Sequence, residues 1–446
     1  MNNDALNQLT QRGLEYLADE DPALYEMLER ETRRQANVLM MVASSSIADP
    51  SVLVCQGMAA TNVSTEGYPG RRYHAGCEVV DEIERLAVKR ARQAFQAQYA
   101  NVQPHSGTTA NQTVMFSLLK PGDTILGLGL KSGGHLSHGS RASASGNVFR
   151  AIGYGLDDAG FIDYEQVAQL AQEHKPKLIV CGASAYPRVI DFQRFRHIAD
   201  EVGAFLLADI SHIAGLVVAG EHPSPIDHAH FTTTSTYKQL FGPRGGLILI
   251  GKDHDLPAPD GKRTLAQLMQ RAVFPYFQGT PNLSGIAAKA RAFHRVATPE
   301  FKTLAQRIKA NARTIARILM DRGYRVITGG TDNHIILFDV LATGVSGVIA
   351  EKALEECRII VNKNSIPGDV KSPLVTSGVR LGTNSLALRG MGPDEMVQCT
   401  ELLVTLLSAV KPQDNRRYEL DSHTRQSVRD GVKSLCRRFP IPRYGV

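Results

Sequence analysis

The sequence predicts an α/β protein, with a mainly parallel sheet in a large domain and a smaller α+β domain at the C-terminal end. As far as about residue 297, short apolar runs alternate with helical segments, which is typical of parallel strands buried on both faces. Beyond residue 298 the pattern changes to one long helix followed by short strands. A chain of 446 residues, 43% of them hydrophobic, is long enough for two cores. We expect an N-terminal helical arm (1–35), a large domain (36–297) and a small C-terminal domain (298–446).

The individual helices and strands follow from periodicity and from end signals. Asp21-Pro22 has the N-cap and first-turn proline of a helix that continues into the thirties. Helical spacing of mostly apolar positions predicts a long helix over 78–99. Further strands are expected at 125–128, 177–181, 205–210 and 246–250, with a helix at 164–173. In the C-terminal part the expected elements are helices at 301–322 and 394–410 and strands at 325–327, 335–340 and 359–361.

The composition argues against several classes of protein. The net charge of +6 is spread along the chain in pairs instead of blocks, so we expect no nucleic-acid partner and favour small anionic ones. The six cysteines lie far apart without a CxxC pair, which indicates reduced thiols and gives no metal site. No segment has the apolar run of a signal peptide or a membrane span. We therefore expect a cytoplasmic protein without a membrane partner.

A helix start after residue 105 is suited to an anion. Ser106, Gly107 and Thr108 open an apolar helix, and small hydroxyl residues with glycine leave backbone N–H groups where a phosphate can bind. Taken alone, the same pattern is also that of an ordinary N-cap.

Two further segments carry groups suited to a pyridine cofactor. Asp209 ends an apolar strand, where open α/β sheets present ligand-binding residues, and its carboxylate can pair with a protonated pyridine nitrogen. It can equally be a helix N-cap. Lys238 lies between a β-rich run and a glycine-rich turn, where burial in a cleft would lower its pKa and make it a nucleophile. The alternative is a solvated loop lysine.

The motifs at 101–107, 133–139, 209–212, 242–246, 361–364 and 377–380 are similar to those of serine hydroxymethyltransferase in order and spacing. The similarity runs from about residue 36 to past residue 396. It implies the fold-type-I architecture of pyridoxal-phosphate (PLP) enzymes, an amino-acid substrate, and a homodimer or dimer of dimers with active sites at the subunit interface.

The resemblance also implies roles for individual residues. Lys238 matches the lysine that binds PLP covalently, Asp209 the partner of the pyridine nitrogen, and His135 the residue stacked on the ring. Arg380 matches the clamp for the substrate carboxylate, a task that suits its rigid fork of donors. The remaining cofactor and substrate positions are Ser106, Gly107 and Thr108 at the phosphate, Ser44 and His212 beside substrate or cofactor, and Gly279 as a phosphate contact from the neighbouring subunit.

A folate pocket is implied as well. Glu66 matches the glutamate that the family uses for proton transfer and folate contact, and a buried carboxylate with a raised pKa would serve as a general acid. As an isolated loop residue it would be exposed. The other positions that match the lining of the tetrahydrofolate site are Tyr73, Leu130, Gly134, Leu136 and Asn364.

Four residues depart from the family pattern near the cofactor. Ser64 and His74 stand where the family has tyrosine, Tyr237 where it has histidine, and Ser45 where it has glutamate. Loss of the aromatic ring at Ser64 should open space beside the substrate, and His74 replaces a phenol by a group that titrates near neutrality. Together with Tyr73, these residues are expected to decide the choice of substrate, unless they are compensated changes in an ordinary member.

Three functions remain open from the sequence. The first is a hydroxymethyltransferase-like enzyme that makes or breaks the Cα–Cβ bond of a β-hydroxy amino acid, with tetrahydrofolate as one-carbon partner. The second is a PLP enzyme of specialised metabolism that works without folate, by β-elimination, transaldol transfer or decarboxylation of a larger amino acid. The third is a catalytically silent paralogue, against which the intact Lys238, Asp209 and Arg380 argue.

Overall fold

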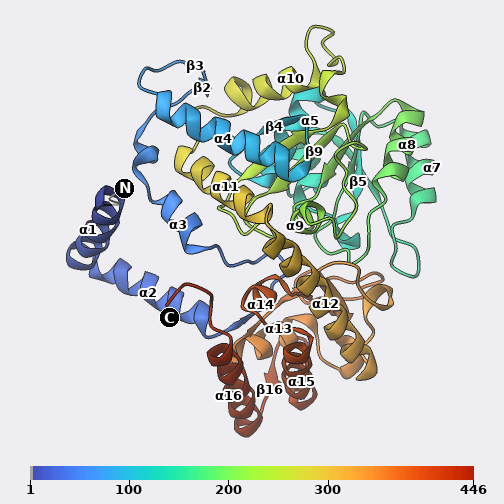
Figure 1. Cartoon of the computed structure of the whole chain (residues 1–446). Coiled ribbons are helices and arrows are strands. Elements are labelled where there is room, and N and C mark those ends of the chain that lie inside the picture. Colours follow the sequence, from blue (N-terminus) through green and yellow to red (C-terminus); the bar gives the residue numbers. More distant parts are fainter. Residues whose placement is uncertain (1–3, 446) are drawn as a thin grey trace.

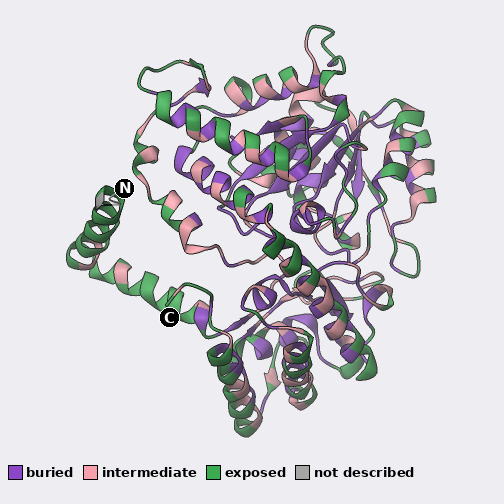
Figure 2. Ribbon diagram, viewed as in Figure 1, coloured by how far each residue is buried: buried purple, intermediate pink, exposed green. Residues whose placement is uncertain are grey.

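The computed structural model describes residues 4–445 and consists of a large α/β body, a smaller body and a helical arm (Figure 1). The arm is formed by α1 (Asp4–Glu20) and α2 (Pro22–Ala36), and it extends away from both bodies with most of its side chains exposed (Figure 2). Asp21 caps α2 as predicted, whereas α1 is an additional helix that the sequence patterns did not separate. No described helix combines the length and the apolar character needed to cross a membrane.

The centre of the large body is a seven-stranded sheet in the order β4-β10-β9-β8-β7-β5-β6. Four neighbouring pairs, from β9 through β8, β7 and β5 to β6, are parallel, while β10 is antiparallel to both of its neighbours. The prediction of a mainly parallel sheet is therefore confirmed. The strands are β4 (Tyr99–Asn101), β5 (Thr124–Leu128), β6 (Arg150–Tyr154), β7 (Leu178–Cys181), β8 (Phe205–Asp209), β9 (Phe231–Ser235) and β10 (Gly246–Ile250).

Helices cover both faces of this sheet, because alternate residues of each strand point to opposite sides. Leu206 and Ala208 of β8 pack under one layer of helices, whereas Leu207 packs under the other. The first layer contains α4 (Glu78–Phe95), α7 (Tyr164–His174), α8 (Phe192–Val202), α9 (Ala214–Val218) and α11 (Leu283–Val296). The second layer contains α5 (Gly107–Leu118) and α10 (Leu265–Arg271). Burial on both faces makes the sheet a rigid support for whatever its strand ends carry (Figure 2).

The smaller body has its own core around a three-stranded antiparallel sheet in the order β11-β14-β13. A short strand near the arm, β1 (Leu39–Met40), pairs with β12 (Ile359–Ile360), so this early segment packs into the second core. We propose that the two cores correspond to two domains, although the boundaries predicted at residues 35 and 297 stay a prediction. The other elements of the smaller body are β11 (Ile335–Asp339), β13 (Asn362–Asn364), β14 (Gly378–Gly382), α12 (Pro299–Asp321), α13 (Gly347–Glu356), α14 (Asn384–Leu388), α15 (Pro393–Ala409), β15 (Lys411–Pro412), β16 (Tyr418–Glu419) and α16 (Ser422–Arg438).

One buried arginine links the segment after the helical arm to the end of α16. Arg389 is 5% exposed and donates hydrogen bonds to the carbonyls of Ala36, Val38, Cys436 and Phe439. A guanidinium offers five N–H donors, so a single side chain can satisfy acceptors from several segments. The start of β1 and the end of α16 are thereby held together.

Two predicted elements differ from the structure. The strand expected at 325–327 is wrong: Val326 makes only one isolated bridge, and the next residues turn instead of extending. The cause is local, since Thr328 and the two glycines that follow all have positive φ angles. The helix expected over 78–99 ends earlier, at Phe95, because Gln96 adopts the left-handed conformation with φ 56°.

Candidate active site

A cavity of about 240 Å³ opens at the carboxyl ends of the central strands, the edge where open α/β sheets bind ligands. Its walls come from the start of α5, from the loops after β5 and β7, and from the segments after β8 and β9. The lining residues are His105, Ser106, Gly107, Thr108, His135, His138, Ala183, Ser184, Asp209, Ser211, His212, Ser235, Tyr237, Lys238, Arg244 and Gly245. Most of the predicted cofactor residues therefore meet in one place.

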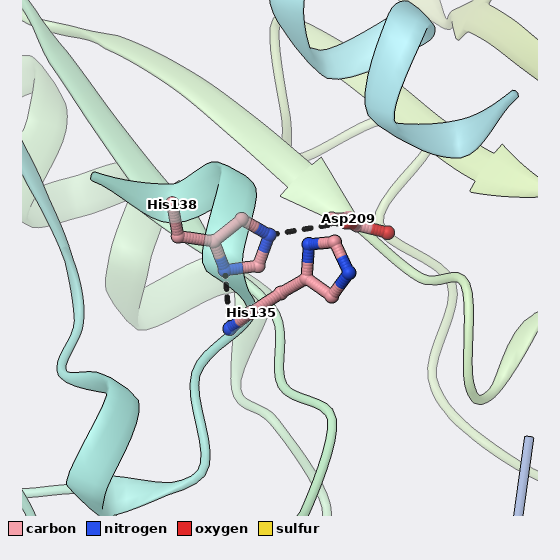
Figure 3. A group of neighbouring side chains, drawn as sticks. All are labelled: His135, His138 and Asp209. Carbon is pink, nitrogen blue, oxygen red and sulfur yellow. Dashed lines mark hydrogen bonds and ion pairs between the residues drawn. The ribbon is translucent and has the colours of Figure 1, made fainter. Parts of the chain in front are cut away.

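Both carboxylate oxygens of Asp209 are held by hydrogen bonds, and Figure 3 shows its side chain beside His135 and His138. It is 7% exposed, and one carboxylate oxygen accepts from Asn111 Nδ2 at 2.7 Å and pairs with His138 Nε2 at 3.0 Å. The other oxygen accepts from the backbone N–H of Ser211 at 3.0 Å. Burial by itself would raise the pKa of Asp209, but the hydrogen bond and charge of His138, the charge of His135 and the bond from Ser211 lower it overall. Asp209 therefore stays ionised, and it does not cap α9, whose N-cap is Ile213.

His135 and His138 come from one short turn after β5 but have different partners (Figure 3). His138 is 5% exposed and points at Asp209, whereas His135 Nδ1 lies 2.8 Å from Ser137 Oγ. Burial lowers the pKa of His135 to about 4, so its ring is neutral at pH 7. His138 belongs to the recognised motif at 133–139, but no sequence pattern assigned it a role, because its contact with Asp209 depends on the packing of two distant strands. Asp209, His135 and His138 also lie close enough to be metal ligands, yet both oxygens of Asp209 already accept hydrogen bonds.

The start of α5 forms a cradle for an anion. Ser106 Oγ accepts a hydrogen bond from the backbone N–H of Thr109 at 3.0 Å. The N–H groups of Gly107 and Thr108 have no acceptor within the helix, because they belong to its first turn. A Cβ on Gly107 would lie 3.2 Å from both Cβ and N of Ser235 and 3.3 Å from Ser211 Oγ, so glycine allows close approach here. The hydroxyl of Ser235 is buried and has no hydrogen-bond partner among the described residues. The polar atoms left over fit a bound phosphate.

Lys238 reaches into the same cavity. Its side chain is 6% exposed, and burial lowers its pKa to about 8, with the positive charges of Arg380 and Arg244 acting in the same direction and Asp209 acting against them. An amine of this pKa is about one-tenth unprotonated at pH 7, far more than an exposed lysine, and the unprotonated form is the one that attacks a carbonyl. The solvated loop lysine considered from the sequence is excluded by this burial. His212 also lines the cavity and is 4% exposed; its Nδ1 has no hydrogen-bond partner within residues 4–445, and burial lowers its pKa.

Arg380 on β14 lies beside the cavity and contacts Ser184, one of its lining residues, from the smaller body. Its Nε donates to Asn362 Oδ1 at 3.0 Å and its Nη1 to the carbonyl of Ser184 at 2.5 Å. Burial lowers its pKa to about 10, and among residues 4–445 it forms no ion pair with a carboxylate. A partly buried guanidinium without a counter-ion is suited to a carboxylate from a ligand.

Tyr237 lies close to Ser45, a second residue that departs from the family pattern. Its ring lies 4.1 Å from the guanidinium of Arg244, and its carbonyl accepts a hydrogen bond from Ser46 Oγ. Tyr237, Arg244 and Ser45 also line a neighbouring cavity of about 380 Å³. Two of the four departures thus share one space next to Lys238.

A second group of predicted residues is assembled elsewhere, outside the lining of the Lys238 cavity. His74 Nε2 lies 3.7 Å from Glu66 Oε2, and a Cβ on Gly279 would lie 3.3 Å from Glu66 Oε1. Tyr73, 73% exposed, packs edge-on against Phe274. In the single chain Glu66 is partly exposed, with its side chain 39% exposed, which is closer to the loop residue than to the buried acid that the sequence left open. Ser64 is also exposed.

The remaining predicted residues do not line the Lys238 cavity. Ser44 and Asn364 are partly buried, Gly134 is buried, and Leu130 and Leu136 are 53% and 47% exposed. A Cβ on Gly134 would lie 1.9 Å from the carbonyl of Leu128, so glycine is required there by packing alone. The folate role of these positions stays a prediction.

Lys289 is a buried amine that the sequence analysis missed. It is 3% exposed and donates to the carbonyls of Val102, Pro104 and Gly246 at 2.6, 3.0 and 2.9 Å. Burial lowers its pKa to about 7, while three acceptors favour the ammonium form. It therefore fastens the segment before Ser106 to the start of β10. No local pattern marks it, since α11 is apolar around it.

Comparison with known proteins agrees with the motifs of the sequence. A family model described as serine hydroxymethyltransferase matches residues 17–403. A serine hydroxymethyltransferase of a Nitratiruptor species is 47% identical over 428 residues, covering 96% of this chain and 99% of that protein. Proteins of the same name from Xanthomonas campestris pv. campestris and Alkalilimnicola ehrlichii are also 47% identical, over 95% and 96% of this chain and 97% and 98% of their own length.

The lowered pKa of Lys238 predicts how the apoprotein captures pyridoxal phosphate. The rate of covalent attachment should rise with pH and level off above about 8, because only the unprotonated amine reacts. The rate is followed by absorbance at constant ionic strength. It is divided by the rate at which the unprotonated amine of a lysine model compound reacts, which corrects for the change in reactivity of pyridoxal phosphate as it ionises. A corrected profile that continues to rise to pH 10, as for an exposed lysine, would contradict the burial argument.

Proposed function

Because the chain belongs to the serine hydroxymethyltransferase family, we propose that it makes or breaks the Cα–Cβ bond of a β-hydroxy amino acid, with tetrahydrofolate as the one-carbon partner. Members of this family are PLP-dependent transferases that use tetrahydrofolate. The observation that carries the proposal is the meeting of Lys238, Asp209 and the cradle at Gly107 in one cavity, with Arg380 directed at it.

The residues of the cavity fit pyridoxal phosphate. Gly107 and Thr108 would hold its phosphate, Lys238 would bind it covalently and Asp209 would pair with its pyridine nitrogen. Bound there, the cofactor supplies an electron sink for the electrons released at Cα. Asp209 suits its role because His138, Asn111 and Ser211 keep the carboxylate ionised.

The chain's own groups would orient the substrate. Arg380 would grip the substrate carboxylate with two parallel hydrogen bonds, and its burial makes that contact strong. His135 is neutral at pH 7, so its ring can pack against an aromatic cofactor without placing a positive charge beside Lys238. Glu66 would move the proton at the reacting oxygen, and His74 Nε2 lies 3.7 Å from its Oε2.

We further propose that a second copy of the chain completes the site. Glu66, His74 and Gly279 form one group, yet none of them lines the cavity that contains Lys238. The exposure of Glu66 and Tyr73 is consistent with their facing the cavity of a partner subunit. The assembly would be a homodimer or a dimer of dimers. A cytoplasmic location also belongs to this proposal; all six cysteines are free thiols, as expected in a reducing compartment.

The second function, on a larger amino acid without folate, is favoured by one specific observation. Ser45 and Tyr237 line a cavity of about 380 Å³ next to Lys238, so the departures from the family pattern coincide with free space beside the cofactor site. Such space would admit a longer side chain than that of serine. The silent paralogue is disfavoured because the buried Lys238 and Asp209 and the partly buried Arg380 are all in place.

Steady-state kinetics separate the first two functions. The native enzyme and the triple variant Ser64→Tyr, His74→Tyr, Tyr237→His are assayed for serine–glycine exchange with tetrahydrofolate, beside a panel of larger amino acids. We expect about tenfold faster exchange in the triple variant, since steric closure improves the orientation of a small substrate. The effects of the three changes should be non-additive if they touch one substrate.

The controls are cofactor occupancy and folding of both proteins. Efficient exchange by the native enzyme would end the larger-substrate alternative and mark the departures as compensated. A folded, fully loaded triple variant without any gain would show that these three residues do not decide the substrate.

Mixed dimers test the shared site. Lys238→Ala and Glu66→Ala variants are each expected to be inactive, but a mixed dimer contains one site with both residues intact if they come from different chains. Random mixing should therefore restore about a quarter of native activity. Mixing Lys238→Ala with Arg380→Ala is the matched control, because Arg380 contacts the cavity lining of the same chain that carries Lys238, and no recovery is expected. Absence of recovery in the first mixture, with subunit exchange verified, would place Glu66 in the site of its own chain.

A further inference from the structure

A separate cavity of about 540 Å³ lies where the large body meets the smaller one. It is bounded by the end of α11, the start of α12, the turn after Lys238 and the last segment of the chain. Its floor is apolar and includes Leu240, Phe241, Phe301 and Leu304. None of its lining residues belongs to the lining of the Lys238 cavity.

Four arginines surround this floor: Arg291, Arg295, Arg307 and Arg443. Two of them share one carboxylate, because Nη1 of Arg295 and Nη1 of Arg443 lie 2.5 and 3.0 Å from Asp49 Oδ2. Burial lowers the pKa of Arg295, and although Asp49 raises it, the charges of Arg443 and Arg291 lower it further. The guanidinium groups are therefore close enough to repel one another.

The other two arginines have no carboxylate partner in the described chain, although Nη1 of Arg291 lies 3.3 Å from Nδ1 of His294. Arg291 donates through Nε to Ser51 Oγ at 2.7 Å, and Arg307 donates through Nη1 to the carbonyl of Ala387 at 3.1 Å. Neither forms an ion pair among residues 4–445, and the second acidic residue of the lining, Glu300, is exposed and equally outside any ion pair. With four guanidiniums against two carboxylates, the cavity carries an excess of positive charge.

We propose that this cavity binds a small organic dianion with an apolar or aromatic body, either a phosphate monoester or a dicarboxylate. Arginine forks match the oxygens of both anions, and two unpaired forks fit two negative charges. The apolar floor would take the body of the ligand, as in most small-molecule sites. A purely structural role, in which the arginines fasten the end of the chain to Asp49, explains Arg295 and Arg443. It does not explain Arg291 and Arg307, which do not contact Asp49.

The floor of the cavity is joined to the cofactor lysine through a short turn. The backbone N–H of Phe241 donates to the carbonyl of Lys238 at 3.1 Å, and Phe241 has a positive φ of 50°, which bulky residues rarely adopt. Its ring is fixed against Phe301 at a centroid distance of 6.2 Å. A ligand that contacts this ring therefore touches the turn that positions Lys238, and its binding should shift the absorbance of the bound cofactor.

Calorimetry on the PLP-saturated enzyme tests the proposal. Phenyl phosphate, phenylsuccinate and inorganic phosphate are titrated in the presence of saturating glycine, which occupies the amino-acid site. We expect at least one of the two aromatic dianions to bind once per chain, about tenfold or more tighter than inorganic phosphate, because its ring is buried on the apolar floor. The preferred probe distinguishes a phosphate source from a dicarboxylate source.

Variants locate the binding. The double variant Arg291→Gln, Arg307→Gln should weaken binding of the preferred probe by about tenfold or more, since charge-assisted hydrogen bonds are lost. Arg317→Gln is the matched control, because Arg317 lies on α12 together with Arg307 but outside the cavity. Its side chain is 63% exposed and forms an ion pair with Asp321. Leu304→Glu, a partly exposed position, places a carboxylate in the cavity and should abolish binding even if the double variant folds poorly.

Several results would overturn the proposal: no saturable binding of either aromatic probe, equal affinity for inorganic phosphate, or unchanged affinity in both folded cavity variants. Failure of the probes to bind because a second copy of the chain fills the cavity would count against it as well. The variants at Arg291, Arg307 and Leu304 assign the binding to this cavity whichever amino acid the enzyme uses, so the proposed function can fail while this site stands.

Discussion

A carboxylate that must stay ionised inside the protein is the constraint around which the candidate site is organised. Asp209 ends the buried strand β8, where desolvation opposes its charge. Three donors offset that penalty, and they come from α5, from the turn after β5 and from the segment after β8. The ionised carboxylate can therefore be buried only when these three parts of the large body are assembled.

The other groups of the cavity depend on the same assembly. Gly107 packs against Ser235, the last residue of β9, and Lys238 lies three residues after Ser235 in the chain. The end of β9 therefore holds the anion cradle and the amine close together. Lys289 fastens the segment before the cradle from the opposite helix layer. Arg380, from the smaller body, contacts Ser184 beside the cavity, which makes the contact between the two bodies part of the site.

Much of this arrangement was predictable because it is local in the sequence. The apolar runs identified β5, β7, β8 and β10, the strand end identified Asp209, and the motifs similar to those of a known family identified Lys238 and Arg380; the family itself is confirmed by the comparisons. What failed depended on contacts between distant segments. His138 and Lys289 have no local signature, and positive φ angles at Thr328 and the following glycines prevent the strand expected at 325–327. Whether Glu66 is buried could not be decided from the sequence, because its exposure depends on where its loop lies in three dimensions.

The most direct test of the account is to trap the bound cofactor on the protein. Purified enzyme loaded with pyridoxal phosphate is reduced with borohydride, digested and mapped by mass spectrometry. The account predicts a single labelled peptide that carries the modification on Lys238, and loss of that label in Lys238→Ala while the buried Lys289 stays unmodified. A label on any other lysine, or no label on a protein that binds the cofactor, would contradict the assignment of this cavity as the cofactor site.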